Sequence, residues 1–455
     1  MRLSPINGAS SLTSSSNNNA TDLVNLINSK ILSQGLDGLS RNFHSQNYPI
    51  KCQPSSVCCS IAVAYPSDRL IPPHHVATAA PRAPPQRISK NWMEYQGISN
   101  WEGLLDPLDD TLRREILRYG EFVEAAYRAF DFNPESETFA TCKHPQSSLL
   151  TRSGIRETGY RLTRHLRATC GVQLPLWMDR MPSWMSTQSS WIGYVAVCQD
   201  KKEISRLGRR DIVIALRGTA TCLEWIENLR ASLTGLHGDV EQDDVPMVQS
   251  GFLSLYTSRT STSPSLQDAI KEEIARIIRT YGDEPLSITL TGHSLGAALA
   301  KLAAYDIRTT FDNAPMVTVV SFGGPRVGNI NFRCRLEDSG TKILRIVNSD
   351  DLVTKVPGFV LENSGLPKNK AVQVTGFPSW FQKSVEDMRW VYADVGQELR
   401  LSSRMSPYHS KGNMATCHEL RTYLQLVNCF VSSACPFKAT ATSLLNFHYP
   451  ENSLL

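Results

Sequence analysis

The stretch TLTGHSLGAALAKLAA, residues 289–304, constrains the fold of this 455-residue chain more than any other. Its first residues complete a strand-like alternation, and its last eight residues are strong helix formers. Between the two, Ser294 lies two residues from Gly292 and two residues from Gly296. A serine on a sharp strand-to-helix turn has a strained backbone, and small neighbours are needed to prevent clashes. The stretch therefore predicts a turn that presents the Ser294 hydroxyl at the carboxyl end of a sheet.

The surroundings of this turn favour nucleophilic chemistry at the serine. The Gly-x-Ser-x-Gly pattern alone is weak, because about one chain in six of this length would contain it by chance. Its position between a strand and a helix makes a tightly packed glycine turn the less favoured alternative. The following helix directs its N-terminus at the site, which stabilises negative charge. We therefore expect Gly292, His293 and Gly296 to build the turn, and the Leu295 N–H to face a developing oxyanion.

A serine hydroxyl is a poor nucleophile without a base, which is usually a histidine oriented by a carboxylate. When the serine occupies such a turn, the acid and then the histidine follow it along the chain. The predicted strand Lys342–Val347 leads to Asp350 and Asp351, and the residues alone do not show which of the two is the acid. The candidate bases are His409, in a loop-like run, and His418, at the opening of a predicted helix.

Strand and helix patterns alternate between about residues 190 and 350, which predicts an α/β fold with a mostly parallel central sheet flanked by helices. One predicted strand, Asp211–Leu216, is almost wholly apolar, as expected of a strand that is buried on both faces. An amphipathic helix is predicted before the sheet, at Asp110–Phe130. The other predicted elements are the strands 191–197, 286–290, 317–322 and 342–347 and the helix 266–281.

The first 90 residues differ from the rest in composition. Residues 1–93 contain eight Lys or Arg but only three acidic residues, and proline-rich runs occur at 72–73 and 81–85. This composition predicts an organelle transit peptide and a Pro/Ser-rich linker over residues 1–90, with a plain disordered tail as the alternative. We expect a single folded domain over residues 91–431 and a C-terminal tail over residues 432–455.

Several classes of protein are disfavoured by composition. After the leader the chain is close to neutral, which gives no electrostatic footprint for nucleic acid. The 11 cysteines lack paired spacing, so a reducing compartment fits better than a disulfide scaffold. No run of 18 apolar residues occurs, so we expect contact with a membrane only from its surface. The histidines lack the spacing of metal ligands, and we expect no metal or organic cofactor.

Seven motifs between Trp92 and about Phe430 carry a resemblance to a known family. They are NWEGLLDPL at 100–108, RREILRYGE at 113–121, WIGYV at 191–195, LRGT at 216–219, GHSLG at 292–296, FGGPRVGN at 322–329 and RIVNSDD at 345–351. With these motifs the chain resembles the class 3, or fungal-type, lipases. Within that family it is similar to the plant DAD1-like chloroplast phospholipases A1.

The resemblance implies an α/β-hydrolase fold of the class 3 lipase type and assigns roles that the residues alone left open. Asp351 matches the family's catalytic acid, which precedes an aliphatic pair, and Asp350 would then be a solvated neighbour. His418 matches the catalytic histidine, which lies in a Cys-His-acid-Leu element. In the family's oxyanion loop, Thr219 would donate its backbone N–H beside that of Leu295.

The resemblance also implies hydrolysis of acyl esters in membrane glycerolipids. The expected activity is that of a phospholipase A1 which releases the sn-1 fatty acid of phosphatidylcholine, with galactolipids as further substrates. The alternatives are an acyltransferase or a galactolipid or triacylglycerol lipase on the same residues, and a non-catalytic lipase-like signalling scaffold. The resemblance and the leader together indicate the chloroplast, and Leu233–Met247 falls where the family carries its lid. Oligomeric state and acyl-chain preference are not predicted.

Overall fold

The computed structural model describes residues 87–434 of the chain. It leaves undescribed residues 134, 156–157, 170–188, 220–232, 237–244, 262, 358–391 and 405–413. The expected leader therefore lies almost wholly outside the described residues, as do His409 and most of the expected C-terminal tail. The middle of the expected lid, residues 237–244, also lies outside them.

In the described part of the chain, seven strands form one sheet in the order β1-β2-β3-β6-β7-β8-β9. The strands are β1 (Tyr160–Thr169), β2 (Ser189–Cys198), β3 (Arg210–Leu216), β6 (Leu286–His293), β7 (Met316–Phe322), β8 (Lys342–Asn348) and β9 (Gln397–Leu401). Strands β1, β2 and β3 pair antiparallel, and the sheet continues from β3 through β6, β7, β8 and β9 with parallel pairing. The predicted mostly parallel α/β sheet is therefore confirmed. A separate antiparallel pair, β4 (Leu233–Gly235) and β5 (Met247–Gln249), bounds the undescribed middle of the expected lid.

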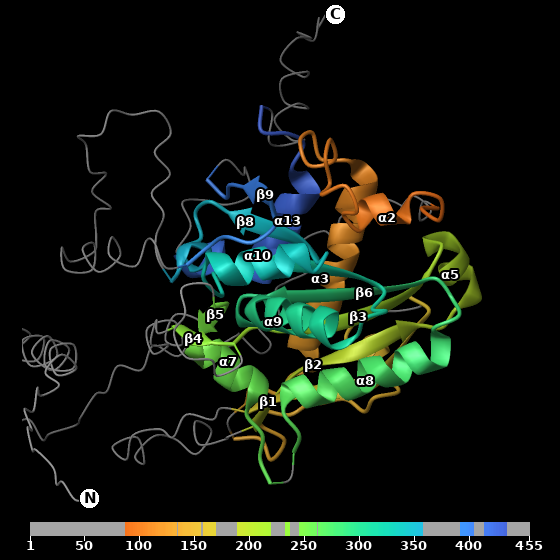
Figure 1. Cartoon of the computed structure of the whole chain (residues 1–455), viewed down its shortest axis with the longest axis vertical. Helices are drawn as coiled ribbons and strands as arrows, with labels where there is room; N and C mark the ends of the chain where they lie inside the picture. The colour runs from red at the N-terminus through yellow and green to blue at the C-terminus, as the bar shows by residue number, and fades with distance from the viewer. Residues whose placement is uncertain are drawn as a thin grey trace, which may run out of the picture. The chain divides into compact units, whose positions relative to one another are not determined.

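Helices cover both faces of the sheet (Figure 1). In Figure 1, α8 and α9 lie in front of the sheet, and α3 crosses behind it. The principal helices are α3 (Asp110–Ala129), α7 (Ser250–Thr257), α8 (Leu266–Tyr281), α9 (Leu295–Thr310), α10 (Ile330–Asp338) and α13 (Leu420–Cys429). Shorter helical segments are α2 (Trp92–Tyr95), α4 (Leu149–Arg152), α5 (Lys201–Leu207), α12 (Met414–Cys417) and the 3₁₀ turn η3 (Val353–Lys355).

Strand β3 shows why the central strands are apolar on both faces. Ile212, Ile214 and Leu216 pack in the core that includes α7, α8 and α9. Val213 and Ala215 point to the opposite face and pack in the core that includes α3 and α13. Alternate side chains of a strand point to opposite faces, so a strand between two helical layers needs apolar residues at nearly every position.

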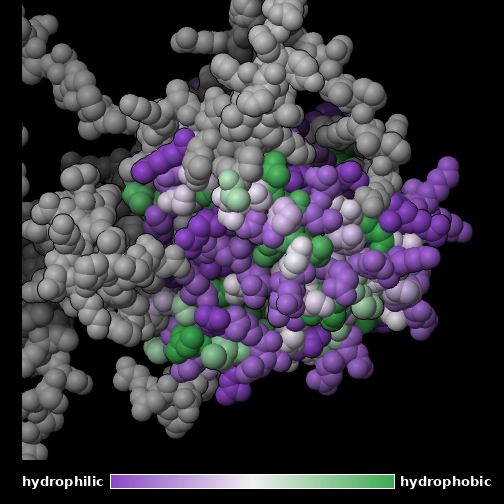
Figure 2. Space-filling model, turned by 90° about the horizontal axis from the view of Figure 1, so that it is seen from above, coloured by the Kyte–Doolittle hydropathy of each residue, from purple (hydrophilic) through white to green (hydrophobic). Residues whose placement is uncertain are grey.

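The surface is mixed in character. On the face shown in Figure 2, hydrophobic residues in the described part of the chain are scattered among hydrophilic ones. The large apolar side chains that are most exposed among the described residues are Met93, Ile98 and Ile330. Isolated apolar side chains of this kind are usual on a water-facing protein surface.

A buried polar cluster joins α3 to the sheet at the end opposite Ser294. The Asp211 carboxylate, at the start of β3, accepts hydrogen bonds from Arg118 at 3.1 Å, Tyr160 at 2.7 Å and Ser287 at 2.9 Å. Burial raises the pKa of Asp211, but Arg209, Arg118 and the hydroxyl donors outweigh it and hold this pKa below its ordinary value. Asp211 is therefore a buried anion that two arginines and four hydroxyl groups stabilise.

We expect Asp211→Asn to lower the free energy of unfolding by about 3–5 kcal/mol, because it leaves the fully buried guanidinium of Arg209 without its counter-charge. Urea denaturation measures this loss. The matched control is Arg333→Gln, which breaks an exposed ion pair with Glu337 (3.0 Å) and should cost less than about 1 kcal/mol. Equal losses in the two variants would contradict a structural role for the buried carboxylate.

Candidate active site

Ser294 occupies a strained turn between β6 and α9. Its backbone has φ 55° and ψ −122°, a region that residues with a side chain rarely adopt. Such a conformation costs about 1–3 kcal/mol and persists only when the surroundings hold it. Here the Ser294 N–H donates to the Phe322 carbonyl at the end of β7, at 3.0 Å. The turn therefore has the backbone that the sequence predicts for it.

Two glycines make this turn sterically possible. A Cβ on Gly292 would lie 2.4 Å from the carbonyl carbon of Gly296, and a Cβ on Gly296 would lie 2.4 Å from the Leu216 carbonyl oxygen. Both distances are too short for any side chain. The first turn of α9 can therefore approach the end of β3 closely, which brings Leu295 and the segment after Leu216 to the same side of the serine.

The imidazole of His418 is hydrogen-bonded to Asp351. His418 lies between α12 and α13, and its Nδ1 is 2.7 Å from Asp351 Oδ2. Asp351, which is 1% exposed, also accepts the Tyr423 hydroxyl at 2.6 Å and the Val353 N–H at 2.9 Å. Because an ionised carboxylate only accepts, Nδ1 carries the proton and Nε2 is the basic nitrogen of the neutral ring.

His418 is brought beside the serine turn by contacts with His293. The two imidazole rings have centroids 4.7 Å apart, and His293 Nε2 is 2.7 Å from the His418 carbonyl oxygen. Since His293 directly precedes Ser294, the turn, the acid after β8 and the histidine before α13 meet at one edge of the sheet. The structure therefore brings together the three residues predicted as acid, base and nucleophile.

Asp350 differs from its expected role as a solvated neighbour, and that prediction is wrong. Its carboxylate accepts the hydroxyls of Ser402 and Ser403, each at 3.0 Å, and the Arg404 N–H, also at 3.0 Å. Burial raises the pKa of Asp350, but these donors outweigh it and hold the pKa below its ordinary value. Asp350 therefore holds residues 402–404, the segment after β9, in place through hydrogen bonds.

The segment after β3 is fixed by the guanidinium of Arg217. It donates to the Gly218 carbonyl at 2.7 Å and to the Trp191 carbonyl at 2.7 and 3.0 Å, and it stacks 3.5 Å over the Phe130 ring. Burial lowers the pKa of Arg217 to about 9. Because the C=O and N–H of one planar peptide point in opposite directions, this hold on Gly218 also fixes the direction of the Thr219 N–H.

Thr219 lies close to the serine turn. A Cβ placed on the preceding Gly218 would be 3.0 Å from Ser294 Cβ. Among the described residues, the Thr219 hydroxyl oxygen is buried and has no hydrogen-bond partner. Leu295 begins α9, so its N–H belongs to the unsatisfied first turn of a helix. The geometry therefore places both residues predicted as oxyanion donors beside the serine.

Three residues that hold the site in place were not predicted from the sequence. They are Tyr127, whose hydroxyl oxygen is 2.7 Å from His293 Nδ1, Arg217, which holds Gly218, and Tyr423, which donates to Asp351. The two tyrosines lie on amphipathic helices, outside the motifs that the sequence shows. Arg217 belongs to the LRGT motif, which by itself indicates only a turn after a strand. No local signal in the sequence shows which hydroxyl or guanidinium will turn toward a site.

Comparison with known proteins identifies the family. Residues 213–361 match the family described as lipase (class 3). Over 368 residues, which are 80% of this chain and 81% of the relative, the sequence is 64% identical to phospholipase A(1) DAD1, chloroplastic, of Arabidopsis thaliana. The chain belongs to the class 3 lipase family. The matched region of this class 3 lipase contains Thr219, Ser294 and Asp351 and ends before His418.

Two further Arabidopsis thaliana relatives are more distant from this class 3 lipase. It is 39% identical to phospholipase A1-Igamma2, chloroplastic, over 75% of this chain and 66% of that protein. It is 40% identical to galactolipase DONGLE, chloroplastic, over 75% of this chain and 70% of that protein. All three relatives are chloroplastic by name, in agreement with the location that the leader and the motifs predict.

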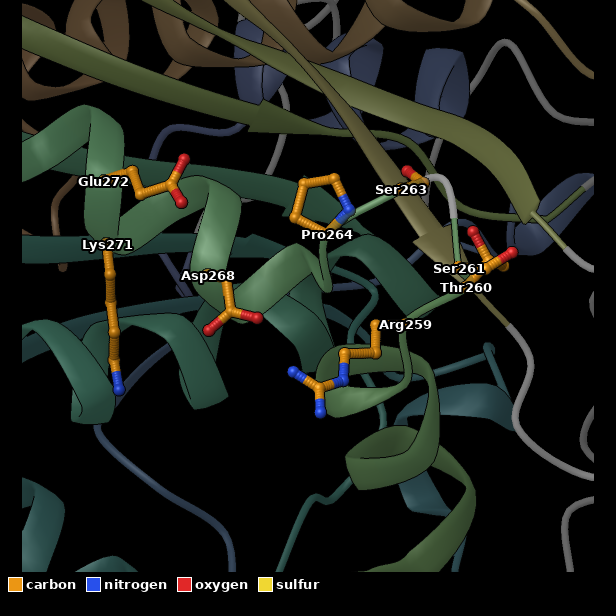
Figure 3. A pocket seen from close by; sticks show the side chains of 8 residues that line it. All are labelled: Arg259, Thr260, Ser261, Ser263, Pro264, Asp268, Lys271 and Glu272. Atoms are coloured by element: carbon orange, nitrogen blue, oxygen red, sulfur yellow. The ribbon is translucent and has the colours of Figure 1, made fainter.

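A surface hollow in the described part of this class 3 lipase lies apart from the predicted site residues. In this hollow, between α7 and α8 (Figure 3), two of the lining charges are paired, Lys271 with Asp306 at 2.9 Å and Glu272 with Arg164 at 2.7 Å. No residue predicted for the site lines this hollow.

Within the described residues, His, Cys, Asp and Glu side chains form no group that could hold a metal ion. None of the described helices combines the length and apolar character needed to cross a bilayer.

Proposed function

We propose that this class 3 lipase is a chloroplast phospholipase A1 that hydrolyses the sn-1 acyl ester of phosphatidylcholine. The observation that carries the proposal is the hydrogen-bonded Asp351–His418 pair beside the strained Ser294 turn. A base oriented by a buried carboxylate is what a serine nucleophile requires. The 64% identity to a phospholipase A(1) supports the choice of substrate.

In the proposed first half-reaction, Ser294 Oγ attacks the ester carbonyl carbon while His418 Nε2 accepts the hydroxyl proton. Asp351 keeps the imidazole in the required tautomer and stabilises its cation. The tetrahedral intermediate then collapses, the bond to the glycerol oxygen breaks, and His418 donates its proton to that oxygen. A lysophospholipid leaves and the acyl group remains on Ser294.

In the second half-reaction, water attacks the acyl-enzyme while His418 accepts one of the water protons. Collapse of this intermediate breaks the bond to Ser294 Oγ, which takes the proton back from His418, and the fatty acid leaves. In both steps the N–H groups of Thr219 and Leu295 stabilise the oxyanion, and one such donor is typically worth about 100- to 1000-fold in rate. The N-terminus of α9 adds its partial positive charge.

In the proposed organisation, one catalytic domain spans residues 91–431. A transit peptide and linker precede it over residues 1–90, and a tail follows it over residues 432–455. We place its substrate at a membrane surface, because a glycerolipid is presented there. The ester must then enter the site from the bilayer while the protein stays peripheral.

A galactolipid is the second candidate substrate, because the chain is also 40% identical to a galactolipase. Both lipids present the same sn-1 ester, so the same residues serve either reaction. A non-catalytic scaffold is disfavoured, because the Asp351 carboxylate is buried against three donors that a scaffold would not need.

The test is a comparison of three lipids with matched acyl chains: phosphatidylcholine, monogalactosyldiacylglycerol and triacylglycerol. We expect the fastest release of fatty acid from phosphatidylcholine vesicles. Faster release from the galactolipid would favour the second candidate. Absence of release from all three lipids by correctly folded protein would contradict the proposed function.

A further inference from the structure

A line of hydrogen bonds joins the segment after β3 to the main chain of His418. The Gly218 N–H donates to the Tyr127 hydroxyl oxygen at 2.8 Å, and that oxygen is 2.7 Å from His293 Nδ1. His293 Nε2 is in turn 2.7 Å from the His418 carbonyl oxygen. The link, Gly218–Tyr127–His293–His418, crosses from β3 through α3 and the serine turn to α13.

The direction of every bond in this link follows from its ends. An amide N–H can only donate, so the Tyr127 oxygen accepts from Gly218 and gives its own proton to His293 Nδ1. Nδ1 is then the acceptor, and the proton on Nε2 is donated to the His418 carbonyl oxygen, which can only accept. The link therefore requires His293 as a neutral ring with its proton on Nε2.

The environment of His293 favours that neutral form. Its side chain is buried, and burial is the main cause that holds the pKa of His293 well below its ordinary value. The nearby His418 ring lowers this pKa further, and the bond to the His418 carbonyl opposes both effects. Geometry and electrostatics therefore agree on one protonation state.

The link uses the N–H of Gly218, whose carbonyl is already held by Arg217. Arg217 holds its carbonyl at 2.7 Å and Tyr127 holds its N–H at 2.8 Å, so Gly218 is fixed on both sides. Its N–H is unavailable to an oxyanion, which leaves the following N–H, that of Thr219, as the donor of this segment. A rigid peptide here presets the donor before substrate arrives.

We propose that Tyr127 and His293 are positioning residues that couple the oxyanion segment to the catalytic histidine. The proposal rests on the proposed function of Ser294 and His418. Neither positioning residue touches the reacting ester in this account. They fix the Thr219 N–H and the His418 main chain relative to Ser294, and a displacement of about 1 Å in such a group can cost 100-fold in rate.

The first test is Tyr127→Phe, assayed on a soluble short-chain ester. We expect kcat to fall about 10- to 100-fold and KM to change less than about twofold, because the oxyanion forms only after substrate has bound. The matched control is Tyr194→Phe, which removes another buried hydroxyl, one that donates to the Phe122 carbonyl of the same helix α3 at 2.8 Å. The control should keep kcat within about twofold of wild type.

A second variant tests the coupling itself. A glutamine at position 293 can place its amide nitrogen near the position of Nε2 and keep the bond to His418, but it has no acceptor where Nδ1 lies. In His293→Gln the link is already broken between Tyr127 and position 293, so adding Tyr127→Phe should lower kcat by a smaller factor than it does in wild type. Losses that multiply in the double variant, or a Tyr127→Phe enzyme as fast as the Tyr194→Phe control, would overturn the proposal.

A measurement without turnover separates this proposal from the proposed function. In protein with ¹⁵N-labelled histidine, Tyr127→Phe should shift the ring resonances of both His293 and His418, and Tyr194→Phe should shift neither. Movement of the His293 signals alone would overturn the coupling. An inactive wild type would instead contradict the proposed function, and the resonances would still decide the coupling.

Discussion

Replacement of Ser294 by alanine should lower kcat for ester hydrolysis by about 10⁶-fold. The variant lacks the oxygen that forms the acyl-enzyme, and the oxyanion donors alone leave only weak residual catalysis. The fold should be retained, because alanine keeps the Cβ that the turn already accommodates. Initial rates on a soluble ester and on phosphatidylcholine vesicles measure the loss.

The matched control for this variant is Ser321→Ala. Ser321 is a buried serine on β7, paired in register with Gly292, and its hydroxyl has no hydrogen-bond partner among the described residues. Its removal should leave kcat within about twofold of wild type. A Ser294→Ala enzyme that keeps more than about one hundredth of the activity would contradict nucleophilic catalysis by this serine. A scaffold would keep its binding partners in both variants.

The second large effect is expected from Asp351→Asn, which should lower kcat about 10⁴-fold. The carboxylate accepts three donors, from His418, Tyr423 and Val353. An asparagine has one acceptor oxygen, and its NH₂ group would face a donor. The His418 ring would then favour the tautomer with its proton on Nε2, which cannot accept the Ser294 proton. Single-turnover rates on a soluble ester measure this loss.

Asp350→Asn is the control that separates the two adjacent acids. Asp350 accepts its hydrogen bonds from residues 402–404 and makes none to His418 in the structure. Its replacement should reduce stability while kcat stays within a few-fold of wild type, because it fastens a neighbouring segment. A greater loss of kcat in Asp350→Asn than in Asp351→Asn would reverse the assignment of the acid.

The central strands and long helices were predictable because each has one dominant local signal. The helix α8 has the predicted bounds, and α3 begins at Asp110 as predicted, where the Asp109 side chain accepts from the N–H groups of Thr111 and Leu112. The edge strands β1 and β9 were not predicted. β1 contains three arginines and a histidine, because an edge strand need not be apolar on both faces. β9 is only five residues long, which leaves little pattern to recognise.

The candidate site was predictable only in part. The serine turn is a local structure, so its glycines and its flanking strand and helix could be read from consecutive residues. The identity of the acid could not be read from consecutive residues. Asp350 and Asp351 are adjacent, and they are distinguished by the direction in which each side chain points in the folded chain. The family resemblance pointed to Asp351, and the tertiary fold supplied the contacts of both.

His418 illustrates the same limit. The sequence predicted His418 at the opening of a helix, and α13 does begin two residues later, at Leu420. The sequence did not predict the short helix α12, which ends at Cys417, so the histidine lies in a break between two helices. That break turns the ring toward Asp351 and the carbonyl toward His293. The Tyr127 and Tyr423 contacts depend on where α3 and α13 pack, which a single sequence does not encode locally.

The central claim is that Ser294 makes this chain a phospholipase A1. The most direct test uses phosphatidylcholine with a different acyl chain at sn-1 and at sn-2, incubated with wild type and with Ser294→Ala, and identifies the released fatty acid by mass spectrometry. We expect release of the sn-1 acid by wild type and none above background by the variant. Release of the sn-2 acid, or equal release by both proteins, would contradict it.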